Sequence, residues 1–163
     1  MVVDTNNTSG LFGGTNAGLI AYYTNFDLST KQQSVSMSFS SDAGRHWSAG
    51  PALIGLAIGD PEVFWNSQAG AWNMVIAIVD AGIPKVAIYK SSTMLSWVYQ
   101  SAFNGTSLSG AVWENPNLFP INLDGNSATP EWVLINGVGD NTTTNRSEMQ
   151  YWVGSFDGST FTA

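Results

Sequence analysis

The sequence AVWENPNLFP, residues 111–120, places a carboxylic acid beside a tryptophan and shortly before a proline. Proline fixes φ and has no amide hydrogen, so Pro116 suits the first residue of a strand or a β-bulge. On this interpretation Glu114 lies just outside the strand ladder. Glu114 is therefore the candidate general acid of this chain.

A second stretch repeats the arrangement. Residues 59–65 read GDPEVFW and align with residues 114–120, ENPNLFP, with proline on proline and phenylalanine on phenylalanine. Equivalent parts of a repeated unit occupy equivalent places in the fold. We expect Asp60 and Glu114 to converge at one rim from different repeats.

The composition excludes several classes of protein. The chain has 163 residues, which favours one domain, and carries a net charge of -7 with 5 Lys and Arg in total. Nucleic acid is not an expected partner, because binding phosphate backbones needs clustered basic residues. No apolar run approaches the ~20 residues of a membrane span. With no cysteine and one histidine, the chain implies no disulfide, metal or organic cofactor.

The rest of the chain shows short β patterns. Residues 34–40 alternate polar and apolar side chains, as a half-buried strand does. Residues 40–47, SSDAGRHW, carry Asp and Gly for a chain reversal. This turn resembles the Asp-box of sialidase-type propellers, where it shapes a hairpin and does not catalyse.

This order of strands recurs along the chain. Three serines mark corresponding hairpins, and each is followed six or seven residues later by an aromatic residue; the pairs are Ser40 and Trp47, Ser91 and Trp97, and Ser155 and Phe161. The pattern predicts an all-β protein of three four-stranded units, with sizes typical of propeller blades. Three blades are fewer than a propeller's usual four to eight, which indicates an arc with exposed edges.

Several motifs occur in the order of one family: residues 7–11 (NTSGL), the Asp-box-like turn, residues 59–65, residues 113–119 (WENPNLF) and residues 150–158 (QYWVGSFDG). Together they resemble glycoside hydrolase family 32, which holds the invertases, inulinases, levanases and related fructosyltransferases. The resemblance implies a five-bladed β-propeller, usually followed by a β-sandwich. This chain would supply blades two to four, at residues 1–55, 56–108 and 109–163.

The resemblance also implies roles for individual residues. Asp60 stands where the family has the aspartate of Arg-Asp-Pro, which stabilises the transition state, and Glu114 where it has the acid/base glutamate of Glu-Cys-Pro. Their neighbours Asn115 and Trp113 are expected to bind substrate. Nothing in the chain matches the family's first-blade nucleophile motif. Gly59 replaces the family arginine, and Asn115 replaces the cysteine.

The implied function is hydrolysis of sucrose or fructans by a retaining double displacement in the intact protein. The isolated chain, without the nucleophile, is expected to be inactive, and the missing blades and a β-sandwich are its expected partners. A non-catalytic fructan-binding or decayed propeller is the alternative, and arabinanase-like five-bladed hydrolases remain an alternative at the level of fold. Asn-x-Ser/Thr sequons at Asn6, Asn7, Asn104, Asn141 and Asn145 favour a secreted, N-glycosylated protein.

Simpler structural explanations compete with these roles. Asp60 also fits a turn aspartate, and Glu114 a solvated loop acid. Trp113 fits either a sugar contact or packing. Gln32 and Gln33 fit either substrate contacts or a polar strand edge.

Overall fold

The computed structural model describes the chain except residues 15–16, 56–58, 106–111, 126–129 and 142–145. Within the described part there are twelve strands and one 3-10 turn, η1 (Leu123–Gly125). The strands are β1 (Val2–Asp4), β2 (Gly18–Phe26), β3 (Gln33–Ser40), β4 (Ser48–Gly55), β5 (Gly59–Asn66), β6 (Ala71–Asp80), β7 (Ile83–Ser91), β8 (Val98–Phe103), β9 (Val112–Ile121), β10 (Glu131–Asn141), β11 (Arg146–Phe156) and β12 (Phe161–Thr162). No helix among the described residues has the length and apolar character needed to cross a membrane.

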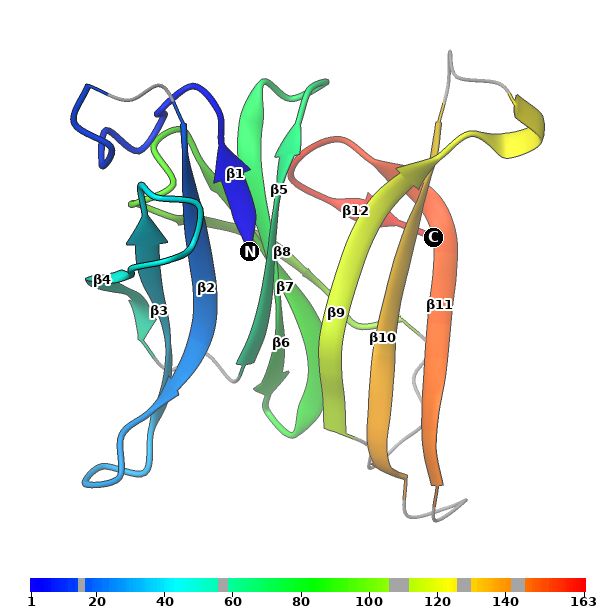
Figure 1. Cartoon of the computed structure of the whole chain (residues 1–163). Helices are drawn as coiled ribbons and strands as arrows, with labels where there is room; N and C mark the ends of the chain where they lie inside the picture. Colours follow the sequence, from blue (N-terminus) through cyan, green and yellow to red (C-terminus); the bar gives the residue numbers. More distant parts are fainter. Residues whose placement is uncertain (15–16, 56–58, 106–111, 126–129, 142–145) are drawn as a thin grey trace.

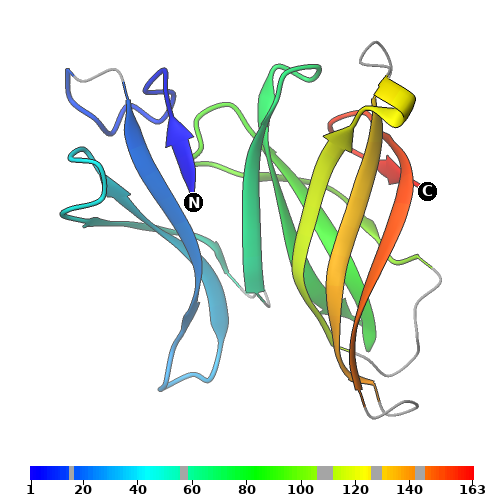
Figure 2. The ribbon, with the colours of Figure 1, turned by 45° about the vertical axis from the view of Figure 1, so that its right-hand side comes forward.

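In the described residues these strands form three four-stranded sheets, ordered β1-β2-β3-β4, β5-β6-β7-β8 and β12-β11-β10-β9. All neighbouring strands within a sheet are antiparallel. Two views show the three sheets standing side by side (Figure 1, Figure 2). The prediction of an all-β chain built from three four-stranded units is confirmed.

The Asp-box-like turn joins β3 to β4, as predicted. Asp42 organises it: its Oδ1 accepts hydrogen bonds from the Ser40 hydroxyl at 2.8 Å and from the His46 amide at 2.9 Å. These bonds, led by that from the His46 amide, hold the pKa of the Asp42 carboxyl well below its usual range. The Trp47 indole folds back and donates to the Gly44 carbonyl at 3.0 Å. The turn shapes a hairpin on the outer side of its sheet.

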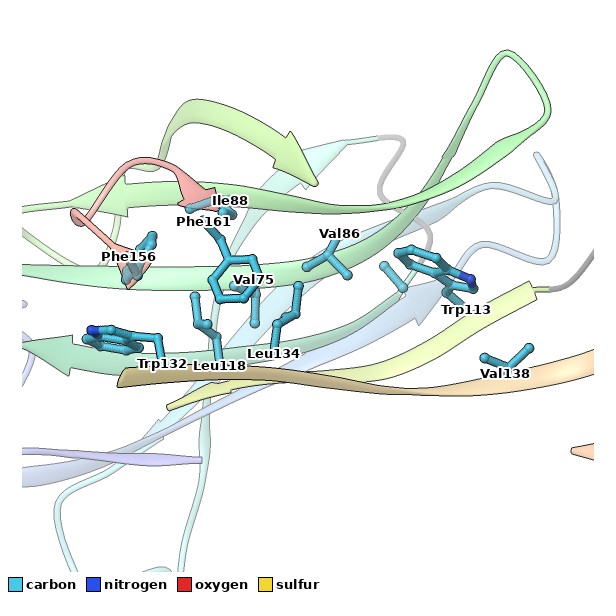
Figure 3. Close-up of a cluster of buried hydrophobic side chains, with 11 residues drawn as sticks. Val75, Val86, Ile88, Trp113, Leu118, Trp132, Leu134, Val138, Phe156 and Phe161 are labelled. Carbon is cyan, nitrogen blue, oxygen red and sulfur yellow. The ribbon is translucent and has the colours of Figure 1, made fainter. Parts of the chain in front are cut away.

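Two hydrophobic clusters join the sheets, and β6 contributes to both. Met74 and Ile76 pack toward the first sheet, while the alternate residues Val75 and Ala77 pack toward the third. A strand buried on both faces reads as a continuous apolar run, which explains the sequence MVIAI at residues 74–78. Figure 3 shows the second cluster, in which side chains from the second and third sheets meet. This packing fixes the start of β9 against the second sheet.

Candidate active site

The strands β5 and β9 carry the same irregularity near their first residues. Relative to β6, β5 has one extra residue between Gly59 and Glu62. Relative to β10, β9 has one extra residue between Glu114 and Asn117. Both are β-bulges, which re-aim side chains and occur beside active sites. The sequence alignment of these two stretches is therefore matched by their backbone geometry.

Each bulge places one residue in the left-handed region directly before a proline. Asp60 has a φ of 56° and Asn115 a φ of 50°. Asp and Asn tolerate this conformation better than other side chains that carry a Cβ. Pro116 lies in the bulge, as one of the two predicted places, but β9 already begins at Val112 and Glu114 pairs with Gly137. The prediction that Glu114 lies just outside the ladder is wrong, because the strand continues through the bulge.

Asp60 and Glu114 line one hollow of about 380 Å³, although they come from different sheets. Thr24 of β2 and Gln33 of β3 line the same hollow. Thr24 and Asp60 also line an adjoining hollow of about 630 Å³, to which Asn115 contributes. The two acidic residues thus line one hollow together with Gln33, and Glu114 also lines a separate hollow of about 230 Å³ formed with β10 and β11.

The Glu114 side chain is exposed, and it lies over a part of β10 that is free of bulky side chains. A Cβ built on Gly139 would stand 3.5 Å from the Glu114 Oε2 atom, in ordinary contact. The strand opposite therefore leaves space around the carboxyl group. Such space is needed if a sugar oxygen is to approach it within hydrogen-bond distance.

Hydrogen bonds connect the two bulges and the first sheet. The Asn115 amide donates to the Asp60 Oδ2 atom at 3.1 Å. The Asp60 amide in turn donates to the Thr24 hydroxyl at 2.9 Å. These bonds fix Asp60 from both sides, so its position depends on all three sheets.

Glu62 is a carboxyl group of this region to which the sequence analysis gave no role. It lines the larger hollow, and its Oε2 accepts a hydrogen bond from the Leu118 amide at 2.7 Å. Burial raises the pKa of Glu62 above its ordinary value, while the bond from Leu118 and the amino-terminal charge act in the opposite direction. Its place two residues after Asp60 was the available signal, but the bulge disturbs the simple alternation of strand faces.

The structure separates the two residues predicted to bind substrate. Asn115 is exposed at the larger hollow. Trp113 also borders the smaller hollow, but the residue is only 2% exposed and its ring packs against Trp152 at a centroid distance of 5.3 Å. Figure 3 shows the indole within the hydrophobic cluster, at the end where Val138 lies. Little of this ring is available to stack on a sugar.

Gly59 adopts a backbone that side chains rarely occupy. Its φ is 149°, and a Cβ added there would stand 3.0 Å from the Thr24 hydroxyl oxygen, tighter than ordinary contact. The same hydroxyl accepts the hydrogen bond from the Asp60 amide. The absence of a side chain at this position is therefore built into the local structure. Among the described residues, no group of three or more His, Cys, Asp or Glu side chains is placed to hold a metal ion.

Three successive four-stranded antiparallel sheets, two of which have matching bulges, define a repeat protein of the propeller kind. The model of the glycosyl hydrolases family 32 N-terminal domain matches residues 1–163. The chain belongs to this family.

Individual relatives agree with the family model. The chain is 39% identical to a levanase of Bacillus subtilis (strain 168) and 35% identical to an extracellular exo-inulinase of Aspergillus niger. The alignments cover 98% and 99% of this chain but only 24% and 34% of those relatives. The chain thus spans about a quarter to a third of their length.

Solved structures of the family have the same fold. A fructofuranosidase from Schwanniomyces occidentalis, complexed with fructose, superposes with a TM-score of 0.84 at 30% identity, over 99% of this chain and 32% of that one. An exo-inulinase from Aspergillus awamori gives a TM-score of 0.81 at 32% identity, over 99% of this chain and 36% of that one. The predicted propeller fold is confirmed. The count of five blades, the assignment of this chain to blades two to four and the blade boundaries stay predictions.

Proposed function

We propose that this chain is part of the catalytic propeller of a retaining β-fructofuranosidase acting on sucrose or a fructan. The observation that carries the proposal is the shared hollow of Asp60 and Glu114, which two equivalent bulges bring together from different sheets. Membership of the family and the names of the relatives, a levanase and an exo-inulinase, support the same substrate class.

In this proposal Glu114 is the general acid/base. It protonates the oxygen of the leaving sugar while a nucleophilic carboxylate attacks the anomeric carbon of fructose, and it then removes a proton from the water that hydrolyses the fructosyl intermediate. Asp60 accepts hydrogen bonds from fructose hydroxyls and stabilises the positive charge that develops in the transition state. Asn115 contributes a polar contact at the rim. Trp113 does not contact the sugar, and its packing in the hydrophobic cluster supports the start of β9.

We propose that the nucleophile and the remaining blades belong to other parts of a longer protein, because the relatives are three to four times as long as this chain. One face of the third sheet supports this view. Met149, Tyr151 and Val153 alternate along β11 and are 66%, 67% and 45% exposed. A further sheet packed on this face would bury them, as the second and third sheets bury the apolar faces between them.

We propose that the protein is secreted, as the extracellular exo-inulinase relatives are. Among the candidate glycosylation sites, Asn6 and Asn104 are exposed. Asn7 is half-buried, and its side-chain Oδ1 atom accepts a hydrogen bond from the Phe12 amide at 3.2 Å. The Asn141 side chain and Asn145 lie outside the described residues.

Fructose release from sucrose and inulin by the full-length protein that contains this chain tests the proposal. Glu114→Gln should lower kcat/KM on the order of 10³-fold, because it removes the proton donor. The matched control is Glu131→Gln at the start of β10, which should leave turnover within about twofold, as for a surface site away from the rim. An active Glu114→Gln variant would refute the assignment, and the purified 163-residue chain should release no fructose.

A specific observation also favours the second candidate, a propeller that binds fructan without cleaving it. Gly59 stands in place of the family arginine, and its backbone is shaped for glycine. Under this alternative the full-length protein would bind inulin in a pull-down but release no fructose. Inulin binding that is independent of Asp60 and Asn115 would exclude this rim as the binding site.

A further inference from the structure

Two backbone amides emerge on the free edge of β9, where a strand ladder gives them no partner. In its sheet β9 is the last strand, paired only with β10 among the described strands. The Asn115 and Leu118 amides lie on either side of Pro116, which has no amide hydrogen of its own. Leu118 is only 1% exposed, so water is not a ready partner for its amide.

The carboxyl groups of β5 supply the missing acceptors. Asp60 Oδ2 accepts from the Asn115 amide at 3.1 Å, and Glu62 Oε2 accepts from the Leu118 amide at 2.7 Å. The two acids are two residues apart on β5, and the two amides span the bulge of β9. The second sheet thus holds the third sheet at two points, one within the bulge at Asn115 and one just after it at Leu118.

The two hydrogen bonds differ in strength. The contact to Leu118 is shorter and partly buried, whereas the contact to Asn115 is longer and exposed. Both acceptors are carboxylates, and a hydrogen bond is stronger where its surroundings exclude water. Glu62 is therefore the firmer of the two anchors, and Glu114 lies directly before the segment that it holds.

We infer that Glu62 is a positioning residue: its bond to the Leu118 amide fixes the bulge of β9 and thereby the place of Glu114. This inference rests on the proposed function, because it assigns Glu62 a part in holding the acid/base of that reaction. Glu62 does not touch the reacting atoms in this account. Its effect passes through the backbone of residues 115–118.

Three substitutions in the full-length protein separate the hydrogen bond from the charge. Glu62→Gln keeps an oxygen that can accept from Leu118, and should retain kcat within about twofold, as a conservative replacement does. Glu62→Asp keeps the charge but withdraws the carboxylate by one methylene, and Glu62→Ala removes it. Both should lower kcat about 10- to 100-fold, the effect of a small misplacement of a catalytic group. KM for sucrose should change by less than about threefold in all of them, because a positioning defect acts on the transition state.

Hydrogen–deuterium exchange provides a readout that does not depend on activity. Peptides covering residues 113–121 should exchange faster in Glu62→Asp and Glu62→Ala than in the wild type, and at the wild-type rate in Glu62→Gln. Glu131→Ala is the matched control and should change neither kcat nor this exchange. If Glu62→Ala does not fold, the comparison of Glu62→Asp with Glu62→Gln still decides the question.

The inference is overturned if Glu62→Asp retains the wild-type kcat, or if Glu62→Gln is as impaired as Glu62→Ala. The first result would show that the reach of the side chain is irrelevant, and the second that charge, not the hydrogen bond, matters. Failure of the proposed function has a different signature, since a fully active Glu114→Gln variant would refute it whatever the Glu62 variants do.

Discussion

The bulges of β5 and β9 share one extra residue and a left-handed residue before a proline, but they place their acids differently. In β5 the left-handed residue before the proline is Asp60, so the carboxyl group stands on the bulge itself, and the glycine before it also has a positive φ. In β9 the residue with positive φ is Asn115, and the carboxyl group belongs to Glu114, one position earlier. A repeated backbone device thus presents two acids from two neighbouring positions.

The two strands also differ in which of them is held. The side chains of β5 accept hydrogen bonds, and the backbone of β9 donates them. Asp60 is fixed further by its amide, which bonds to Thr24 in the first sheet. The repeated bulges thus place the two acids, and hydrogen bonds between the sheets, which are not repeated, fix their position.

After the loss expected for Glu114→Gln, the largest effect comes from removing the acid on the β5 bulge. Asp60→Ala and Asp60→Asn should each lower kcat/KM for sucrose about 10²- to 10³-fold, because both remove the negative charge that faces the developing positive charge. Initial rates of the full-length protein provide the measurement. Asp80→Asn, an exposed acid paired with Lys85 at 2.7 Å, is the control and should retain activity. Wild-type rates for Asp60→Asn would show that its charge has no catalytic part.

Gly59 provides a second test of the difference between the two bulges. Gly59→Arg restores the family residue but forces a side chain into a strained φ beside the Thr24 hydroxyl. The variant should lose about 1–3 kcal/mol of unfolding free energy, and its turnover should not rise. Urea denaturation and sucrose hydrolysis test the two parts. A gain in turnover of tenfold or more would instead identify Gly59 as the mark of a decayed active site.

Asn115 tests the equivalent position in β9. Asn115→Val should destabilise the protein by about 1–2 kcal/mol, because a β-branched side chain disfavours a φ of 50°. Asn115→Gly has no such penalty, and its free energy of unfolding should lie within roughly 0.5 kcal/mol of the wild-type value. Chemical denaturation at one pH compares the pair. Equal stability of the two variants would mean that the bulge relaxes without cost.

The smallest expected effect is the pH-dependent change in stability of Glu62→Gln. Burial raises its pKa in the folded chain above the ordinary value of 4.5, so the folded state binds more protons in the window above 4.5. The stability contributed by this group is fully present below the unfolded pKa and is lost as pH rises through the folded pKa. Relative to the wild type, Glu62→Gln should therefore become more stable between pH 4 and 7, by less than about 1 kcal/mol for a partly solvated group.

The other titratable side chains that line the same hollow are Asp60, Tyr22 and Tyr23. They are present in both proteins, so the difference between the two stability curves isolates Glu62. A difference that stays flat from pH 4 to 7, or that changes in the opposite direction, would contradict the role of burial.

Much of this architecture could be predicted from the sequence, because local patterns carry it. Alternating strands, the Asp-box-like turn and the two matching proline stretches predicted three four-stranded units, and the repeat predicted that Asp60 and Glu114 share a rim. The roles of Glu62 and Thr24 could not be predicted in this way. Both depend on contacts between sheets, and no local pattern reports which backbone amide a side chain will meet after the sheets pack.

Trp113 illustrates the same limit from the other direction. Its place beside Glu114 suggested a sugar contact, yet alternation along β9 turns its ring to the opposite face, into the cluster shared with Trp152. The position of Trp113 in the sequence predicted the strand that carries it, but not which face of β9 its ring would pack on.

The role of Glu114 as the acid/base is tested most directly by azide rescue of Glu114→Ala. The substrate of the full-length protein is p-nitrophenyl β-fructofuranoside. This leaving group needs no protonation, so the loss of the acid/base should slow mainly the second step, where water must be activated. Azide, which needs no activation, should restore turnover and yield a fructosyl azide of retained configuration. Unchanged sucrose hydrolysis by Glu114→Ala, or loss of activity that azide does not relieve, would contradict the assignment of Glu114 as the acid/base.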